Sequence, residues 1–425
     1  MSIVLERWLR PADRFLPMLF AALLGVALFA TSWTLLHQSF FARYQIADTP
    51  VYQRYGNAMV HGEVPYRDFH VEYPPAALPT FLLPAIGTPV QAQYRQRFGW
   101  EMLACGVAML VLVAATLSAL GAGLWRLAGA LAFAGLAPLA LGSVVLTRFD
   151  LWPAAIGAGA LLALVARRER LGSGLLGLGF AAKLYPGVLL PLALAFVWKQ
   201  KGREEAVRCA VVFLAVVLAL FVPFFVLSPG GVWDSFFQQG DRPLQIESLG
   251  SAFLLALHHL FGLAVTMKPG HGSQNIAGTG AIAIAAVQTV LQIAAVVAIW
   301  VWYVRGEPSR ERLVRGAAAA VCAFVALGKV LSPQFLIWLV PIVPLVRGRR
   351  GLAASALLGA ALILTQGWFP RDYWDLALRF DETASWLVLA RDLVLLGLLA
   401  VLVLPSRPVF EGLRRRAPAR PDRTR

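Results

Sequence analysis

The 425-residue chain has few charged residues, little cysteine and hardly any lysine. Charged residues make up 14% of it and hydrophobic residues 59%, whereas an ordinary soluble domain has about 25% charged residues. This composition argues against a soluble enzyme and against a disordered protein. The net charge of +15 does not indicate nucleic-acid binding, because the basic residues separate long apolar runs instead of covering a soluble surface. The composition is that of a polytopic membrane protein.

The three cysteines, Cys105, Cys209 and Cys322, each lie within an apolar run, with no CxxC spacing. We therefore expect small core residues and neither a disulfide framework nor a metal site. No cleavable signal peptide is evident either. The first apolar run, Pro17 to Leu36, follows several arginines, and its length of about 20 residues is that of a retained span.

Long apolar runs are what the chain has instead, and about 20 apolar residues cross the hydrocarbon core of a bilayer. Eight candidate spans are 17–37, 98–121, 127–147, 151–166, 206–227, 280–303, 351–368 and 384–404. Basic clusters lie at 7–14, 126, 167–170, 199–208, 305–315, 347–350 and 407–425. Because cytoplasmic loops are rich in lysine and arginine, these clusters predict the cytoplasmic side.

Two further apolar stretches, 171–198 and 316–346, lie between clusters that must share that side. Each is broken near its middle, at 183–186 and at 328–334, which predicts two helical hairpins with Lys-and-Pro tips pointing outward. The run 251–267 would reverse the topology if it spanned, so we predict an interfacial or re-entrant outer helix there. The expected fold is an all-α bundle of about twelve spans with both termini cytoplasmic. All six histidines then fall on the outer side, which favours an outward-facing site.

The first outer loop, 38–97, is the richest in polar motifs. Its segment 48–59 has the apolar spacing of a short helix, and the prolines after Tyr73 predict a juxtamembrane helix over 76–88. Asp48, with a proline in the following turn, is a typical helix N-cap. An N-cap aspartate can also accept a proton in a reaction, and the two interpretations are compatible.

Lys183 and Lys329 occupy the two hairpin tips, at a depth where a charge costs about 2.5–3.5 kcal/mol on insertion scales. They either snorkel to the outer headgroups or hold an anion such as a lipid phosphate, and the similarity of the tips favours the anion. Arg148 and Asp150, in a tight outer turn, form either a surface ion pair or a phosphate donor held by an acid.

Several other polar or aromatic residues have structural interpretations. Arg391 and Asp392, inside the last span, are expected to neutralise each other. For Tyr73 and Trp368, a role as anchors at the interface is favoured over the alternative of substrate binding. The pair His258 and His259 lacks metal-ligand spacing with other His or Cys residues, so we expect a surface role.

Five motifs in order carry a resemblance to a known family: Asp48 to Tyr52, Gly62 to Tyr66, Tyr73 to Pro75, Lys183 to Pro186 and Ser332 to Gln334. Together, over roughly residues 17–346, they resemble the GT-C membrane glycosyltransferases. Within these the chain is most similar to glycosyltransferase family 87, the bacterial mannosyltransferases that use polyprenyl-phosphate sugars.

The resemblance implies a single glycosyltransferase domain over 1–425 that transfers a sugar, with mannose expected, from polyprenyl phosphate with inversion. The implied partners are the lipid-linked donor, a glycolipid or envelope-glycan acceptor and membrane lipids of the bacterial plasma membrane, with no cofactor and no nucleic acid. The loop 228–279 matches no motif, and 405–425 is a basic cytoplasmic tail. The family's catalytic aspartate corresponds to Asp48.

The residue chemistry is compatible with that reaction, because the acceptor hydroxyl needs a base and the departing phosphate needs cations. Lys183, Lys329 and Arg148 are the candidates for binding the donor phosphate. The candidates for other substrate contacts are Tyr52, His61, Tyr66, His70, Glu72, Tyr73, Asp150, Tyr185 and Gln334.

A transporter or lipid flippase is the main alternative, because broken helices at membrane depth are also typical of transporters. The hairpins 171–198 and 316–346 are, however, not embedded in matching halves of the chain, and transport does not explain the polar first loop. A non-catalytic scaffold of an envelope-assembly complex is the third interpretation.

Overall fold

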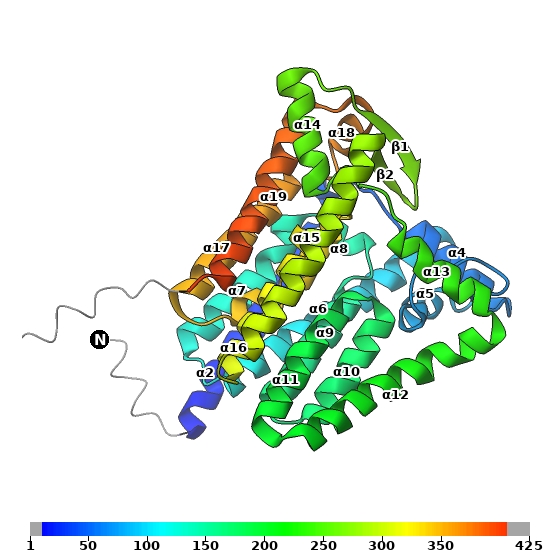
Figure 1. Ribbon diagram of the computed structural model, residues 1–425. Helices are drawn as coiled ribbons and strands as arrows, with labels where there is room; N and C mark the ends of the chain where they lie inside the picture. Colours follow the sequence, from blue (N-terminus) through cyan, green and yellow to red (C-terminus); the bar gives the residue numbers. More distant parts are fainter. Residues whose placement is uncertain (1–10, 406–425) are drawn as a thin grey trace, which may run out of the picture.

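The structure is a computed structural model that describes residues 11–405. Long helices lie side by side and form a bundle, and short elements gather at one end of it (Figure 1). The longer helices are α2 (Pro11–Leu35), α6 (Gln91–Ala119), α7 (Leu124–Leu141), α9 (Leu151–Val165), α10 (Glu169–Ala182), α11 (Leu190–Lys201), α12 (Arg203–Leu227), α15 (Thr279–Val304), α16 (Arg310–Ala326), α17 (Gly348–Gln366) and α19 (Glu382–Val403). The shorter helices are α3 (Ser39–Arg43), α4 (Thr49–Val60), α5 (Leu78–Ala85), α8 (Val144–Thr147), α13 (Pro229–Gly240), α14 (Leu249–Phe261) and α18 (Tyr373–Arg379).

Within residues 11–405, six helices are long and apolar enough to cross a membrane, judged by length and composition: α2, α6, α7, α12, α15 and α19. No residue in the apolar stretch of α12 is fully buried, and large apolar side chains such as Val211, Leu214 and Phe225 are exposed on its surface. Because exposed apolar surface of this extent is stable in lipid but not in water, the chain is a multi-pass membrane protein.

Small residues bring the helices of the bundle close together, as at the contact between α2 and α7. A Cβ atom at Gly135 would lie 2.7 Å from the carbonyl oxygen of Gly25, so only glycine fits there. The Ser32 hydroxyl of α2 donates a hydrogen bond of 2.8 Å to the Gly135 carbonyl. Close backbone approach combined with a polar contact is a typical way for membrane helices to associate.

Basic residues from loops far apart in the sequence meet at the other end of the bundle. Lys199 Nζ donates to the Gly306 carbonyl at 2.8 Å, and Arg347 forms an ion pair with Glu311 at 2.5 Å. Arg315 Nε reaches a carbonyl near the end of α19 at 2.5 Å. These contacts confirm the prediction that the basic loops lie at the same end of the bundle. The assignment of that end to the cytoplasm stays a prediction. The clusters at residues 7–10 and 407–425 lie outside the described residues.

The two predicted hairpins differ in the structure. The first has two helices, α10 and α11, joined by Lys183 and a 3₁₀ turn, Tyr185–Leu189. In the second, α16 ends at Ala326 and the return consists of 3₁₀ turns over Pro333–Trp338 and Val343–Leu345. The predicted second helical half is therefore wrong. Three prolines in 333–344 each remove a backbone donor, and such backbone is tolerated at membrane depth when it is buried in protein, as here.

The segment 228–279, which matched no motif, has structure of its own. It contains α13, α14 and an antiparallel hairpin of β1 (Thr266–Gly270) and β2 (Ser273–Ala277), the only sheet within residues 11–405. The two-residue turn has positive φ at both positions, 53° and 65°, as hairpins of this kind require. The outer helix predicted over 251–267 is present but shorter, as α14. The last residues of the predicted helix, 266–267, belong to strand β1 instead.

In the first outer loop, α4 and α5 confirm the two predicted short helices. Arg391 and Asp392 form a fully buried ion pair of 2.6 Å, as predicted. Trp368 is fully buried too, so its expected role as an interfacial anchor is wrong. Its ring lies 5.8 Å from the Arg391 guanidinium and helps to surround that buried charge.

Candidate active site

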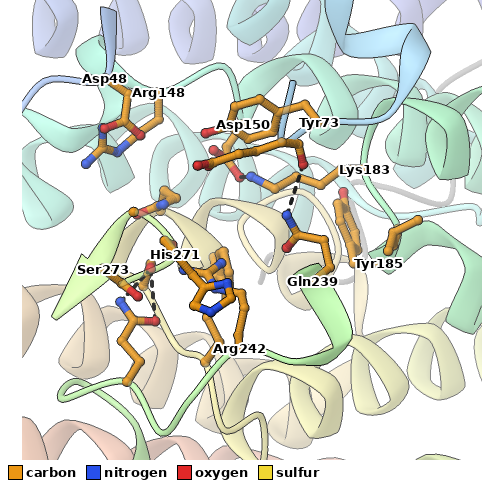
Figure 2. A pocket seen from close by; sticks show the side chains of 18 of the residues that line it. Asp48, Tyr73, Arg148, Asp150, Lys183, Tyr185, Gln239, Arg242, His271 and Ser273 are labelled. Atoms are coloured by element: carbon orange, nitrogen blue, oxygen red, sulfur yellow. Dashed lines mark hydrogen bonds and ion pairs between the residues drawn. The ribbon is translucent and has the colours of Figure 1, made fainter. Parts of the chain in front are cut away.

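One cavity of about 580 Å³ lies where the first outer loop, the two hairpin tips and the segment 228–279 meet (Figure 2). Most of the residues that the sequence singled out line it, although they come from distant parts of the chain. These residues are Asp48, Tyr52, Tyr66, Glu72, Tyr73, Arg148, Asp150, Lys183, Tyr185, Lys329 and Gln334. Their convergence makes this cavity the candidate active site.

Asp48 occupies the N-cap position of α4, but its side chain accepts no capping hydrogen bond. It forms an ion pair with Arg148 instead, as Figure 2 shows, and the Tyr52 hydroxyl lies 3.5 Å from its other oxygen. The Asp48 side chain is 32% exposed and that of Arg148 only 8%. The N-cap interpretation is thus right about the position of Asp48 and wrong about its side chain, which faces the cavity.

Asp150, at the start of α9, and Lys183, at the tip of the first hairpin, form a second ion pair of 2.6 Å. The same carboxylate oxygen accepts a hydrogen bond of 2.7 Å from the Trp338 indole. The Lys183 ammonium lies 4.6 Å from the centroid of the Phe149 ring. Lys183 is therefore held inside the protein and does not snorkel. Of the two alternatives for Arg148 and Asp150, the surface ion pair is wrong, because each residue is buried with another partner.

Lys329 and Arg242 are two further cations of the cavity, and the contacts that they donate go to backbone carbonyls. Lys329 Nζ donates to the Gly240 carbonyl at 2.9 Å, and Arg242 Nη2 donates to the His271 carbonyl at 3.3 Å. Burial lowers the pKa of Arg242, and the Glu72 carboxyl acts in the opposite direction. Among the described residues, no carboxylate forms an ion pair with either of these two cations, whereas Arg148 and Lys183 each have such a partner.

Aromatic rings form another part of the wall. Tyr185 stacks on Trp338 with ring centroids 4.2 Å apart and planes 3° apart. Tyr73 packs edge-on against Phe149 at 5.0 Å, and its carbonyl accepts a hydrogen bond of 2.6 Å from the Tyr66 hydroxyl. Tyr73 is thus part of the cavity wall and not the interfacial anchor that the sequence suggested.

Two candidates from the sequence, His61 and His70, are exposed and lie outside the cavity lining. Helix α4 ends at Val60, and the His61 ring turns back to the carbonyl of Asn57 at 2.7 Å. His258 is likewise bonded locally, to the Leu263 carbonyl at 2.7 Å. No group of three or more His, Cys, Asp or Glu side chains within residues 11–405 is arranged to hold a metal ion.

Several polar residues of the cavity were missed by the sequence analysis, and most of them belong to the segment 228–279. Among them are Gln239, Arg242, Gln245, Glu247, Ser273 and Gln274. Burial raises the pKa of Glu247 to about 8, while Arg391 and Arg148 act in the opposite direction. These positions match no motif, and the polar run ahead of the apolar helix α14 was a local signal only for Gln239, Arg242, Gln245 and Glu247.

Comparison with known proteins gives one family and several similar chains of solved structures, among them two structures of ArnT. No curated protein matches the chain. The structure of ArnT from Cupriavidus metallidurans bound to undecaprenyl phosphate is 15% identical, with a TM-score of 0.48, and covers 89% of this chain and 76% of that one. The apo structure of the same protein has the same identity and coverage and a TM-score of 0.45.

The model of glycosyltransferase family 87 matches residues 69–333. This range contains Arg148, Asp150, Lys183 and Lys329, and Asp48 precedes it. The match covers more than half of the chain, and the protein belongs to glycosyltransferase family 87.

Proposed function

We propose that this glycosyltransferase takes its sugar, with mannose expected, from a polyprenyl-phosphate-linked donor. It passes the sugar to a glycolipid or envelope-glycan acceptor at the outer face, with inversion. The observation that carries the proposal is the convergence of one accessible carboxylate, Asp48, and several cations on a single cavity. The cavity lies away from the end where the basic loops meet, which the positive-inside rule assigns to the cytoplasm.

The proposed reaction is a single displacement at the anomeric carbon. The acceptor oxygen forms a bond to that carbon while the bond from the carbon to the phosphate oxygen breaks. The acceptor proton passes to the Asp48 carboxylate, which acts as general base. The polyprenyl phosphate departs as a monoester and gains negative charge, which nearby cations stabilise.

The two ion pairs suggest which cations receive the phosphate. Arg148 is already neutralised by Asp48 and Lys183 by Asp150, so an incoming phosphate would have to compete with a carboxylate for either of them. Within residues 11–405, Lys329 and Arg242 form no ion pair with a carboxylate and donate to backbone carbonyls instead. We therefore propose that the phosphate binds first at Lys329 and Arg242, with Lys183 and Arg148 at the border of its site.

The aromatic and polar residues around the cations complete the proposed substrate contacts. Tyr185, stacked on Trp338, presents a rigid apolar face beside Lys183, and Gln334 lines the cavity next to the Lys329 tip. Tyr52, Tyr66, Tyr73 and Glu72 line the side of the first outer loop. These residues are in position to contact the sugar or the start of the lipid chain.

The test is the substitution Asp48→Asn in purified protein, with radiolabelled polyprenyl-phosphate-mannose as donor. Loss of a general base lowers the rate by about 100- to 10,000-fold, and the amide can still accept a hydrogen bond from Arg148, so the fold is expected to persist. Asp234→Asn, at an exposed aspartate of α13 outside the cavity, is the matched control. Full transfer by a folded Asp48→Asn protein would contradict the assignment of the base.

The acceptor is best identified in cells. Glycolipids and glycans of the envelope are compared between a deletion strain and the same strain complemented with the intact gene. A glycan that is truncated by one sugar in the deletion strain names the acceptor. An unchanged profile would count against a role in envelope glycosylation and favour transport.

A further inference from the structure

We propose that Glu247, Gln274 and Tyr373 form a subsite of the cavity that binds a neutral, hydroxyl-bearing sugar ring. All three residues line the cavity, and none of them belongs to a motif recognised in the sequence. The place of this subsite in a reaction rests on the function proposed above, but its ligand chemistry rests on contacts of its own.

The first observation is a pair of hydrogen-bond acceptors without partners. Glu247 is 2% exposed, and within residues 11–405 no group donates a hydrogen bond to its Oε1 atom or to Oε1 of Gln274. Leaving a buried polar atom unsatisfied costs about 1–3 kcal/mol. Because both atoms are acceptors, the ligand that satisfies them must bring donors, as sugar hydroxyls do.

The second observation is that these acceptors lie next to aromatic surface. The Ile246 amide donates to the Gln274 carbonyl at 3.0 Å, so the segment that contains Glu247 lies against β2. Burial raises the pKa of the Tyr373 phenol, and the neighbouring Glu247 carboxyl raises it further. Trp374, beside Tyr373 in α18, also lines the cavity and is 49% exposed. An aromatic face beside hydrogen-bonding groups suits a sugar ring, which presents C–H bonds on its face and hydroxyls at its edge.

The third observation is that Glu247 is held in place by several other elements of the fold. Arg391 of α19 donates through Nη2 to the Glu247 carbonyl at 2.5 Å. Gln245 Nε2 binds both the Glu247 carboxyl and, at 2.9 Å, the Ser332 hydroxyl of the second tip. The carboxyl is thus oriented before any ligand arrives, as an efficient binding site requires. The buried pair of Arg391 and Asp392 acquires a role through this contact, which is to position the Glu247 backbone.

The charge of the subsite favours a neutral ligand over a phosphate. Burial raises the pKa of the Glu247 carboxyl to about 8, so at pH 7 it is mostly protonated and can both donate and accept. The groups that face it are Arg391 and Asp392 from α19, Arg148 from the loop before α9, and Tyr373 from α18. A phosphate oxygen only accepts hydrogen bonds, so it could use the carboxyl proton but would leave Oε1 of Gln274 unsatisfied, whereas sugar hydroxyls can satisfy both groups.

The binding experiment uses the complete protein in detergent and methyl α-D-mannopyranoside as the probe, with saturation-transfer NMR as the readout. Wild type should bind the glycoside saturably at pH 7, and Glu247→Ala and Gln274→Ala should weaken binding by about tenfold each. Glu247→Gln, which keeps the shape and a neutral donor and acceptor, should bind within a few-fold of wild type. Glu63→Gln, at an exposed glutamate outside the cavity, is the matched control.

A pH series separates this role from a merely structural one. Binding by wild type should weaken as the pH rises through about 8, because Glu247 loses its proton there, and binding by Glu247→Gln should not. Three outcomes overturn the proposal: no saturable binding by wild type, unchanged affinity in the folded Glu247→Ala and Gln274→Ala proteins, or Glu247-dependent binding of inorganic phosphate in place of the glycoside.

The transfer assay then distinguishes the two sources of the sugar. A higher KM for the polyprenyl-phosphate-mannose donor in Glu247→Ala or Gln274→Ala identifies the transferred sugar as the occupant, and a higher KM for the acceptor identifies the acceptor sugar. Unchanged values of both KM overturn the subsite even if transfer proceeds. If no transfer from this donor occurs at all, the proposed function fails while the binding experiment still decides the subsite.

Discussion

The ion pair between Lys183 and Asp150 supports the sharpest test of how the cavity is built. Asp150 is 1% exposed and Lys183 16% exposed, so the pair is largely removed from solvent. Removing one partner of a buried pair leaves the other charge uncompensated, which destabilises a protein by about 3–5 kcal/mol. Lys183→Met is the appropriate change, because it keeps the length of the side chain and removes only the ammonium group.

The expected loss can be expressed as a melting temperature. A change of 1 kcal/mol moves Tm by about 2–4 °C in a domain of 150–250 residues, and by about half as much in a chain of this length, because the entropy of unfolding scales with size. Lys183→Met should therefore lower the apparent Tm by about 3–10 °C. The measurement is thermal unfolding in detergent at one fixed scan rate.

The double variant Lys183→Met with Asp150→Asn separates stability from catalysis. It removes both charges while the new amide can still accept the hydrogen bond from Trp338, so at least about half of the lost stability should return. Transfer activity should not return if Lys183 contacts the donor. An unchanged Tm in Lys183→Met would refute the burial argument. Recovery of activity in the double variant would show that Lys183 acts only on Asp150.

Three further predictions follow from other parts of the structure. Arg148→Ala should reduce kcat/KM more than Arg148→Lys, because lysine restores the charge but not the planar fork. Gly56→Ala should lower the apparent Tm, because the added Cβ atom would lie 2.2 Å from the Phe81 carbonyl oxygen. Gly99→Ala should raise the apparent Tm slightly, because no atom lies within 4 Å of the added Cβ and alanine favours the helix. Burial raises the pKa of Glu247 from 4.5 to about 8, so the folded state holds this proton more tightly and stability falls as the pH rises between those values; Glu247→Gln should remove this part of the decline in a pH series of Tm.

The sequence predicted the local elements of this protein well, because apolar run length, proline positions and turn signals act over a few residues. It located α4, α5 and the first hairpin, and it identified Asp48, Lys183 and Lys329 as unusual. It failed where tertiary packing overrides local preference. The return half of the second hairpin is not an α-helix, since buried surroundings tolerate its prolines, and Trp368 lies in the core beside Arg391.

The composition alone determined that the chain is a membrane protein and which polar residues are available for chemistry. Only the tertiary structure decided how those charges pair. Asp48 and Arg148, which form an ion pair, are 100 residues apart. Asp150 forms an ion pair with Lys183 of the first hairpin and accepts a hydrogen bond from Trp338 of the second. No spacing rule predicts such pairs, because the energy of a charge inside the bundle depends on which partners three-dimensional packing brings within a few ångströms. For the same reason, the sequence did not identify Glu247 and Gln274 as residues that line the cavity.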